Sequence, residues 1–152
     1  MSMIARHKKT GGFRKLVNSL ETTAVHKRNK ILEVMKLEDP EFIADVEGSI
    51  FTFNEFSNVS DPVICEIVDC IKTELRTLAF ALYDSSQSGL AEKFTRNMGP
   101  STYRAYREEV DSIEQPSLGN IITAQFRIIT KVRALENEGK FVIKKYLGNY
   151  GI

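Results

Sequence analysis

The chain has no tryptophan and only two cysteines, four prolines and two histidines among its 152 residues. So few thiols and imidazoles leave little material for a disulfide framework or a zinc site, and the sequence predicts neither a metal nor a cofactor. No apolar run approaches the ~20 residues that cross a bilayer, which excludes direct membrane insertion. A formal net charge of +1 excludes a globally basic nucleic-acid binder.

Catalytic patterns are also missing. No phosphate-binding glycine loop is present, and no serine or cysteine nucleophile accompanies a plausible base, because His7 and His26 both lie in the basic N-terminal third. Cys65 and Cys70 are five residues apart in an expected helix, on different faces. We therefore expect a non-enzymatic cytoplasmic protein in which both cysteines are reduced core residues.

Charge is segregated locally although the total is balanced. Residues 1–30 hold eight lysines and arginines against one acid, Glu21, whereas residues 37–61 hold seven acids and no lysine or arginine. One explanation is that both segments are solvated helix faces. The other is that oppositely charged segments of two copies attract each other, which would give self-association.

Apolar residues recur at helical spacing almost throughout, which predicts an all-α protein. We expect a basic flexible leader or linker over 1–12, ending in Gly11-Gly12, and an armadillo-like unit of three short helices over 13–49. The aromatic-rich residues 50–58 predict a junction. Residues 59–152 are expected to form a C-terminal helical subdomain.

Capping residues, prolines and glycines suggest where several helices begin and end. Asp39-Pro40 and Asp61-Pro62 are each typical of an N-cap followed by proline in the first turn. A long apolar stripe from Leu118 to Leu135 predicts a helix that stops before Gly139. Gln125 lies within that stripe, where we expect an amide bonded to nearby backbone rather than a ligand.

Residues 101–114 predict a helix with two contrasting sides. Aromatic and aliphatic residues fall on one side, and the other side presents Arg104, Arg107, Glu108 and Asp111, with Glu109 at its flank. The pairs from Arg104 to Glu108 and from Arg107 to Asp111 would stabilise the helix by only ~0.2–0.5 kcal/mol each. Stability alone does not explain this charged ridge, which suggests a surface for contacts with another protein.

An ordered set of motifs gives this chain a family resemblance. They are Asn97-Met98, Arg107-Glu108-Glu109, Ala124-Gln125 and the nonapeptide from Leu135 to Ile143. Together they resemble the C-terminal domain of the flagellar motor switch protein FliG, and the likeness runs from about residue 11 to 143. It implies an armadillo-like unit followed by a six-helix subdomain in a right-handed superhelix.

The resemblance also implies roles for particular residues. Gly11 and Gly12 are similar to the linker that opens the last armadillo unit of the family. Ile50, Phe51, Thr52 and Phe53 are similar to its Met-Phe-x-Phe hinge, with isoleucine in place of methionine. That hinge would let the last subdomain swivel when rotation reverses.

The family uses three basic and two acidic positions to contact the cytoplasmic loop of the stator protein MotA. The resemblance places the acids at Glu108 and Glu109, but it places Ser101, Ser117 and Tyr83 at the three basic positions. Arg104 and Arg107 are candidates to replace the missing charges. The implied partners are MotA and the FliG and FliM switch subunits, at the cytoplasmic face of the inner membrane.

Two roles within the motor remain open at this stage, torque transmission and an accessory, paralogue-like role on the switch. A role unrelated to motility is the alternative. The chain would then be a cytosolic helical scaffold or regulatory domain, similar to the superhelix of the cytosolic part of MgtE-type magnesium transporters. The block from Asn97 to Ile143 and the lack of an acidic cluster at Mg²⁺-ligand spacing favour the motor.

Overall fold

The computed structural model describes residues 4–84, 88–148 and 150, and every regular element among them is a helix. The predicted all-α fold is therefore confirmed. Contacts divide the chain into two compact units, Met1–Phe51 together with Lys144–Ile152, and Thr52–Ile143. We refer to them as unit 1 and unit 2.

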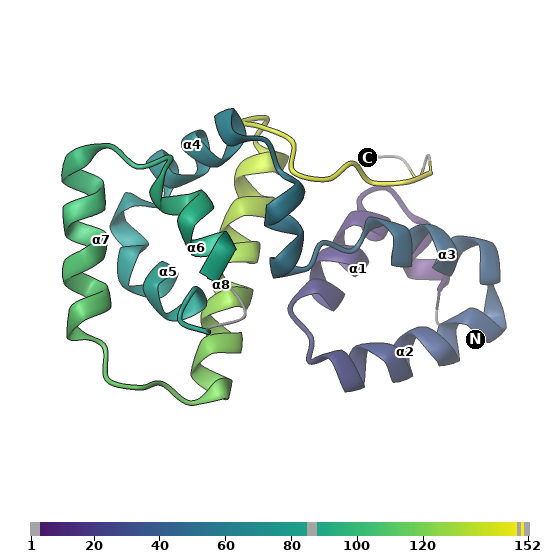
Figure 1. The fold of residues 1–152 in the computed structure, drawn as a ribbon. Coiled ribbons are helices and arrows are strands. Elements are labelled where there is room, and N and C mark those ends of the chain that lie inside the picture. Colours follow the sequence, from purple (N-terminus) through teal and green to yellow (C-terminus); the bar gives the residue numbers. More distant parts are fainter. Residues whose placement is uncertain (1–3, 85–87, 149, 151–152) are drawn as a thin grey trace. The chain divides into compact units, whose positions relative to one another are not determined.

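Unit 1 is built from one 3-10 helix and three α-helices. They are η1 (Ala5–Lys8), α1 (Gly12–Glu21), α2 (Val25–Glu38) and α3 (Pro40–Ser49), and both α1 and α2 pack on α3 (Figure 1). The core contains Phe13, Val17, Phe42, Ile43 and Val46, each at most 2% exposed. These helices therefore surround one small apolar core.

The junction between α2 and α3 is set by Asp39 and Pro40. The Asp39 carboxylate accepts a hydrogen bond from the backbone N–H of Phe42 at 3.1 Å, and Pro40 is the first residue of α3. Lys8 forms an ion pair with the same carboxylate. Hydrogen bonds from Lys8 and from backbone N–H groups lower the pKa of Asp39. The predicted cap is thus formed by the expected residues.

Residues 4–12 are folded against unit 1 rather than extended as a flexible leader. Ile4 is 1% exposed within the core, and η1 packs on α1. Gly11 has φ of +80°, and a Cβ on Gly12 would lie 2.7 Å from the carbonyl oxygen of His7. The Gly-Gly pair therefore permits a tight turn and a close backbone approach, which a linker would not need.

Unit 2 contains the remaining helices. They are η2 (Phe53–Asn58), α4 (Asp61–Cys70), η3 (Lys72–Glu74), α5 (Leu75–Ala81), α6 (Ser88–Thr95), α7 (Pro100–Ser112) and α8 (Leu118–Asn137). The short α5 packs against both α7 and α8, and α4 packs against α6 (Figure 1). Phe56 joins η2 to α6 through an edge-to-face contact with Phe94, with ring centroids 5.4 Å apart.

The helix ends of unit 2 agree only partly with the sequence patterns. α8 ends at Asn137, and Gly139 has φ of +85°, as expected for a glycine just beyond a helix. α4 begins one residue earlier than predicted, because Ser60 is the N-cap and Asp61 is the first helical residue. Asp61 is free to make other contacts.

Several residues assigned to the core are on the surface. Cys65 is exposed and Cys70 is only partly buried, so the prediction of two core cysteines is wrong. Val34 in α2 and Leu118 in α8 are 51% and 66% exposed although both lie in predicted apolar stripes. Each stripe is wider than the face its helix buries.

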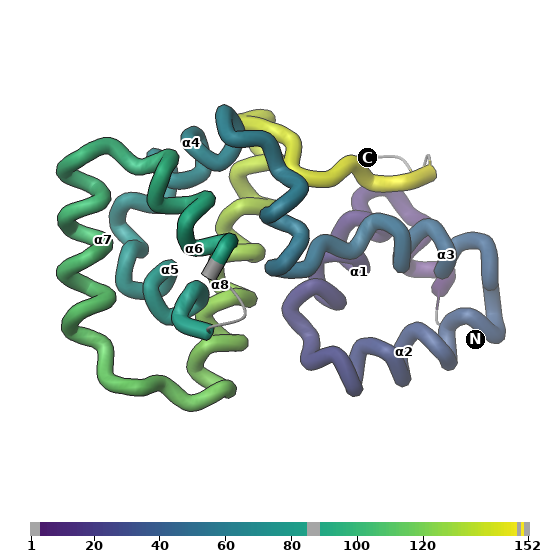
Figure 2. Tube along the Cα trace, viewed as in Figure 1, coloured from purple at the N-terminus to yellow at the C-terminus, as the bar shows by residue number. Residues whose placement is uncertain are grey.

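The last described residues return to unit 1. We expected 59–152 to form one subdomain, but the chain from 144 to 148, with Tyr150, lies against α1 and α3, as the yellow end of the tube shows (Figure 2). The chain therefore passes from unit 1 to unit 2 after Phe51 and back again after Ile143. Among the residues that the structure describes, no helix is both long and apolar enough to cross a bilayer.

Candidate interaction surface

α7 is an amphipathic helix with a narrow buried side. Gly99 precedes it and Pro100 occupies its first turn, where the missing N–H of proline costs nothing. Tyr106 is 4% exposed and faces the interior, and burial raises the pKa of its phenol. The charged residues are therefore left on the opposite side, as predicted.

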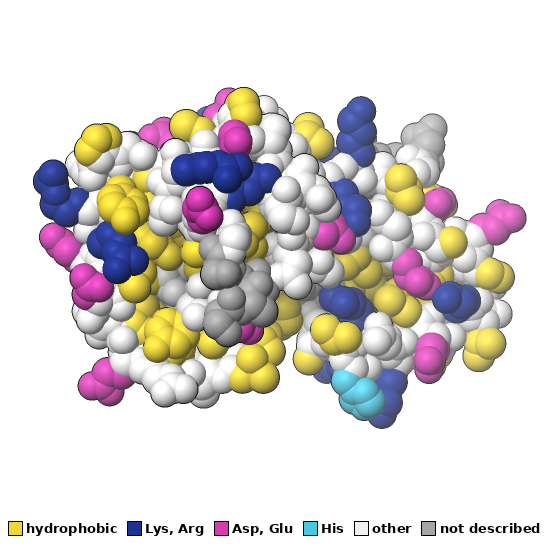
Figure 3. Space-filling model, viewed as in Figure 1, with side chains coloured by type: hydrophobic (Ala, Val, Ile, Leu, Met, Phe, Trp, Pro, Cys, Tyr) yellow, Lys and Arg dark blue, Asp and Glu magenta, His cyan; other side chains and the backbone are white. Residues whose placement is uncertain are grey.

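Cationic and acidic side chains lie interspersed along this outer side (Figure 3). Arg107 pairs with Asp111 at 3.6 Å, one turn apart. Arg104 and Glu108 do not form the expected pair, and neither has an ion-pair partner among the described residues. Glu108 thus presents an uncompensated carboxylate to solvent.

Glu109 is tied to the neighbouring helix. Arg76 of α5 donates from one Nη atom to Glu109 Oε2 and to Ser112 Oγ, both at 3.1 Å. The Ser112 hydroxyl in turn donates to the backbone carbonyl of Glu109 at 2.9 Å. Two adjacent acids of one motif therefore have different surroundings, since one is free and one is held between α7 and α5.

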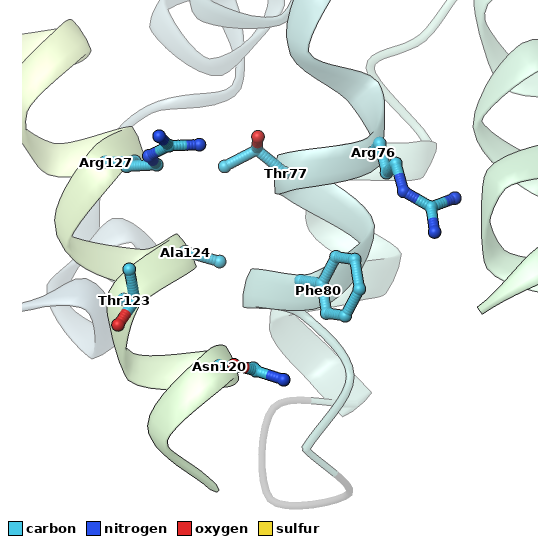
Figure 4. Close-up of a pocket in the computed structure, with 7 residues that line it drawn as sticks. All are labelled: Arg76, Thr77, Phe80, Asn120, Thr123, Ala124 and Arg127. Carbon is cyan, nitrogen blue, oxygen red and sulfur yellow. The ribbon is translucent and has the colours of Figure 1, made fainter. Parts of the chain in front are cut away.

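A surface groove of about 380 Å³ lies between α5 and α8. Arg127 extends from α8 toward Thr77 of α5, and farther along lie Phe80 of α5 and, beyond it, Asn120 of α8 (Figure 4). The groove is lined by two arginines and no carboxylate, and its full lining is Arg76, Thr77, Phe80, Asn120, Thr123, Ala124 and Arg127. It places positive charge one helix away from Glu108 and Glu109.

Ser101, Ser117 and Tyr83 have different structural settings. Ser117 is the N-cap of α8, and its hydroxyl accepts a hydrogen bond from the N–H of Asn120 at 3.1 Å. Ser101 is exposed in the first turn of α7, and Tyr83 is 40% exposed just after α5. Of the three, Ser117 has a local role of its own, because it satisfies a helix terminus.

The Asn97-Met98 motif lies at a polar junction between α6 and α4. The Asn97 side chain donates to Asp61 Oδ1 at 3.0 Å and to the Lys93 carbonyl at 2.8 Å. Arg96 pairs with the same Asp61 carboxylate at 2.9 Å. The bonds from Asn97 and Arg96 lower the pKa of Asp61. This motif joins two helices of unit 2.

The Leu135 to Ile143 motif supplies the acid of a buried ion pair, whose arginine, Arg133, lies two residues before the motif. Arg133 and Glu136 are 2% and 6% exposed at their side chains, and Arg133 Nη1 lies 2.7 Å from Glu136 Oε1. The other carboxylate oxygen of Glu136 accepts the backbone N–H of Ile143 at 2.7 Å. Glu136 thereby fastens the segment after Gly139 to the end of α8.

Gln125 behaves as the sequence predicts. Its amide donates to the backbone carbonyl of Ala81 at 3.1 Å, so it joins α8 to the end of α5. The partner is backbone, but it is distant in sequence. The Ala124-Gln125 motif therefore contributes to helix packing.

The proposed hinge residues are mostly buried. Ile50, Phe51 and Phe53 are 7%, 1% and 5% exposed, and the boundary between the units falls between Phe51 and Thr52. The backbone N–H of Phe51 donates to the buried Glu21 carboxylate at 2.8 Å. The Lys144 ammonium donates to the Ile50 carbonyl at 2.7 Å. Ile50 and Phe51 are thus fixed within unit 1.

Sequence reasoning missed the arginines that matter most. Arg76 and Arg127 were unremarkable as isolated surface charges, because only the packing of α5 on α8 brings them to one groove. Arg133 did leave a signal, since it follows Ile129 by four residues on the apolar side of α8 and precedes Glu136 by three. A charged pair at that spacing on an apolar face indicates a buried ion pair.

Comparison with known sequences gives one family. The model of the FliG C-terminal domain family matches residues 16–143. The flagellar motor switch protein FliG of Thermotoga maritima is 28% identical over 130 residues, and that of Aquifex aeolicus 27% over 128, covering 86% and 84% of this chain. The chain spans 37% of the length of each of these relatives.

Solved structures show the same fold. A crystal structure of FliG from H. pylori superposes with a TM-score of 0.61 at 22% identity, covering 87% of this chain and 61% of that one. The structure of full-length FliG from Aquifex aeolicus gives a TM-score of 0.54 at 25% identity, covering 86% and 40%. The helical arrangement is therefore shared despite low sequence identity.

Proposed function

The chain belongs to the FliG C-terminal domain family, and from this premise we propose that it is a non-enzymatic component of a bacterial flagellar motor switch, on its rotor side. The observation that carries the proposal is α7, which presents Glu108 to solvent without an ion-pair partner among the described residues. Unpaired exposed charge contributes little to folding and is suited to recognition.

The proposed contact is with the cytoplasmic loop of the stator protein MotA. Glu108 is the primary contact, and Glu109 contributes a carboxylate whose position is fixed by Arg76. Arg104 is exposed without an ion-pair partner among the described residues and is available to an acidic group of the stator, whereas Arg107 is partly neutralised by Asp111. Charges arranged in this way govern encounter rate and register more than affinity.

The sequence at the remaining positions supports a modified role. Ser101, Ser117 and Tyr83 carry no charge where the family resemblance calls for cations. Ser117 is also occupied as the N-cap of α8. We propose that the chain transmits less torque than a full set of charges would and acts as an accessory unit that docks on FliG or FliM subunits.

The hinge function is assigned to the passage from Phe51 to Thr52. Because the Phe51 N–H donates to Glu21 and the Ile50 carbonyl accepts from Lys144, both residues are held within unit 1, and rotation begins at Thr52. Phe53 is buried in unit 2 against Phe56, with centroids 5.3 Å apart. Phe51 and Phe53 are buried in different units on either side of Thr52, which supports a hinge with a defined pivot. The place of action is the cytoplasmic face of the inner membrane, at the flagellar basal body.

In-cell photo-crosslinking tests the proposal. A photoreactive residue at Ser101 lies two turns from Glu108 on the same side of α7 and leaves both acids intact. Capture of MotA, lost when Glu108→Lys and Glu109→Lys are combined, would support a working stator surface. Capture of FliG or FliM alone would support the accessory role.

A probe at Lys131, an exposed position on α8, is the matched control. The double lysine variant should change the melting temperature little, because Glu108 is exposed and Glu109 makes only an exposed pair. Equal capture from both probes would contradict a specific surface. If no flagellar protein is captured, the chain is a helical scaffold outside the motor.

A further inference from the structure

Residues 144–148 and 150 form a tail that lies against α1 and α3 without regular secondary structure (Figure 2). Its described contacts include those of the Tyr146, Leu147 and Tyr150 side chains and of the Leu147 backbone N–H. Such a segment has no internal hydrogen-bond ladder of its own, so its position depends on the surface that receives it.

Tyr150 is the main anchor of the tail. Its ring stacks on Phe13 with a centroid distance of 4.5 Å and an interplanar angle of 8°, and it meets the edge of Phe42 at 5.0 Å. Its hydroxyl donates to Asp45 Oδ2 at 2.5 Å. One side chain thereby touches both helices of the receiving surface, through its ring and through its hydroxyl.

Tyr146, four residues before Tyr150, is a second anchor of the tail. The guanidinium of Arg14 lies 4.4 Å from the centroid of its ring, and the amide of Asn18 donates to its hydroxyl at 2.8 Å. Both partners come from α1. A cation over an aromatic face and a hydrogen bond to the phenol together favour tyrosine over other residues at this position.

Between the two anchors, α3 has a recess that fits Leu147. A Cβ on Gly48 would lie 2.4 Å from Leu147 Cδ1, so a larger residue there would force the Leu147 side chain to shift. The N–H of Leu147 donates to Ser49 Oγ at 2.8 Å, and Ser49 is fully buried. Gly48, the penultimate residue of α3, thus lets Leu147 approach the helix closely.

We propose that the surface formed by α1 and α3 is a peptide-docking site, that its occupant is the chain's own tail, and that the tail is a releasable second tether between the units. With the tail docked, unit 2 is joined to unit 1 at two places, after Phe51 and after Ile143. With the tail released, only the passage from Phe51 to Thr52 remains. This inference holds whether or not the chain acts in a motor.

The receiving surface is expected to persist without its occupant. Phe13 and Phe42 contact each other edge to face with ring centroids 5.6 Å apart, and α1, α2 and α3 supply most of the other buried residues of the unit 1 core, which also includes Ile4 and Ile50. The tail itself is partly open to solvent, since Leu147 is 43% exposed. Local opening of such a segment requires less free energy than unfolding of the unit.

Amide hydrogen exchange on the full chain tests the docking site. Tyr150→Ala and Gly48→Ala should each raise exchange of the Leu147 amide about tenfold or more, while the amides of α1 and α3 keep their protection. Gly119→Ala is the matched control, because it places the same methyl in α8, where the nearest atom is 3.8 Å away. It should leave the tail unchanged.

Three results would overturn the proposal. Unchanged protection of Leu147 in Tyr150→Ala would mean that the tail is not anchored there. Parallel loss of protection in α1 and α3 would make the tail an integral part of the core. A concentration-dependent dimer of the parent chain that Tyr150→Ala abolishes would assign the occupant to a second copy.

The tether itself needs a separate readout. Backbone ¹⁵N relaxation gives a rotational correlation time for each unit, and the two times should diverge in Tyr150→Ala compared with the parent chain. Equal divergence in Gly119→Ala, or no divergence in Tyr150→Ala, would contradict a second tether. Neither measurement involves MotA, so its outcome is independent of the crosslinking experiment.

Discussion

Unit 2 contains two arginine–glutamate pairs of the same chemistry in opposite surroundings. Arg133 and Glu136 are almost completely buried at the end of α8, whereas Arg76 and Glu109 are 57% and 36% exposed between α5 and α7. Both involve a guanidinium within hydrogen-bond distance of a carboxylate. Their expected contributions differ because water competes for the exposed pair and has been removed from the buried one.

The difference in burial between the two pairs distinguishes residues that hold the fold together from residues that are suited to recognition. A buried charge must keep its partner, so Arg133 and Glu136 constrain each other and the segment that follows them. An exposed pair constrains little and can exchange its partner for one on another protein. Position in the pattern alone does not show which kind of residue is present.

The largest effect is expected from breaking the buried pair. Arg133→Met leaves Glu136 buried without its guanidinium, which should lower the free energy of unfolding by about 3–5 kcal/mol. Urea denaturation measures the loss. Lys131→Met, at an exposed position of the same helix, should change stability by less than about 0.5 kcal/mol. A cost below about 1 kcal/mol for Arg133→Met would remove the contrast between the two pairs.

Replacing both buried partners sharpens the comparison. Arg133→Met combined with Glu136→Leu removes the uncompensated charge, so the double variant should be more stable than Arg133→Met alone by about 1 kcal/mol or more. Recovery should be incomplete, because the N–H of Ile143 loses its carboxylate acceptor. Additive losses in the double-mutant cycle would show that the two charges act independently.

The hydrogen bond from Tyr150 to Asp45 in unit 1 is expected to have an effect of intermediate size, and its contribution to stability can be measured as a function of pH. The hydrogen bond to Asp45 raises its pKa to about 12, above the ordinary value of 10.0. Because the pKa is higher in the folded state, the hydrogen bond of the neutral phenol stabilises the protein fully below pH 10. This stabilisation is lost as the pH rises from 10 to 12. Tyr150→Phe should cost about 0.5–1.5 kcal/mol at neutral pH and flatten that decline.

Urea midpoints at pH 8, 10 and 11 would measure this effect, with Tyr83→Phe as a control at an exposed phenol. If Tyr150→Phe left the decline above pH 10 unchanged, the hydrogen bond to Asp45 would not be its source.

The smallest effect is expected at the exposed pair. Arg76→Gln should lower the free energy of unfolding by only about 0.2–1 kcal/mol, and the difference should shrink in 1 M salt because exposed charges are screened. Denaturation at low and high salt measures it. Arg133→Met should show no comparable salt dependence. A loss as large as that of the buried pair would mean that Glu109 has a structural role.

The sequence predicted the local features well. Asp39, Pro40 and Gly139 define helix ends through contacts with residues only a few positions away, and such contacts follow from sequence spacing. Gln125 was also predicted correctly as a bond to backbone, because an amide on an apolar face needs an acceptor. The prediction of an all-α fold rested on the same short-range patterns.

Features that depend on long-range packing could not be predicted. The pairing of Arg76 with Glu109 and the exposure of Cys65 depend on which helices become neighbours. Val34 and Leu118 show that an apolar stripe can be wider than the surface that covers it. The return of Tyr150 to Phe13 left no local signal, since an aromatic residue in a polar segment has no periodicity to indicate its partner.

Unit 1 is formed by two stretches of the chain that are separated by unit 2, and this has a consequence for folding during biosynthesis. Ile4, Phe13 and Phe42 are translated before unit 2, but the ring that stacks on Phe13 belongs to Tyr150 and leaves the ribosome only after all of unit 2. Unit 2 is contiguous and can complete its core as soon as Ile143 emerges. Unit 1 therefore completes its folding after unit 2, although most of unit 1 is translated before unit 2.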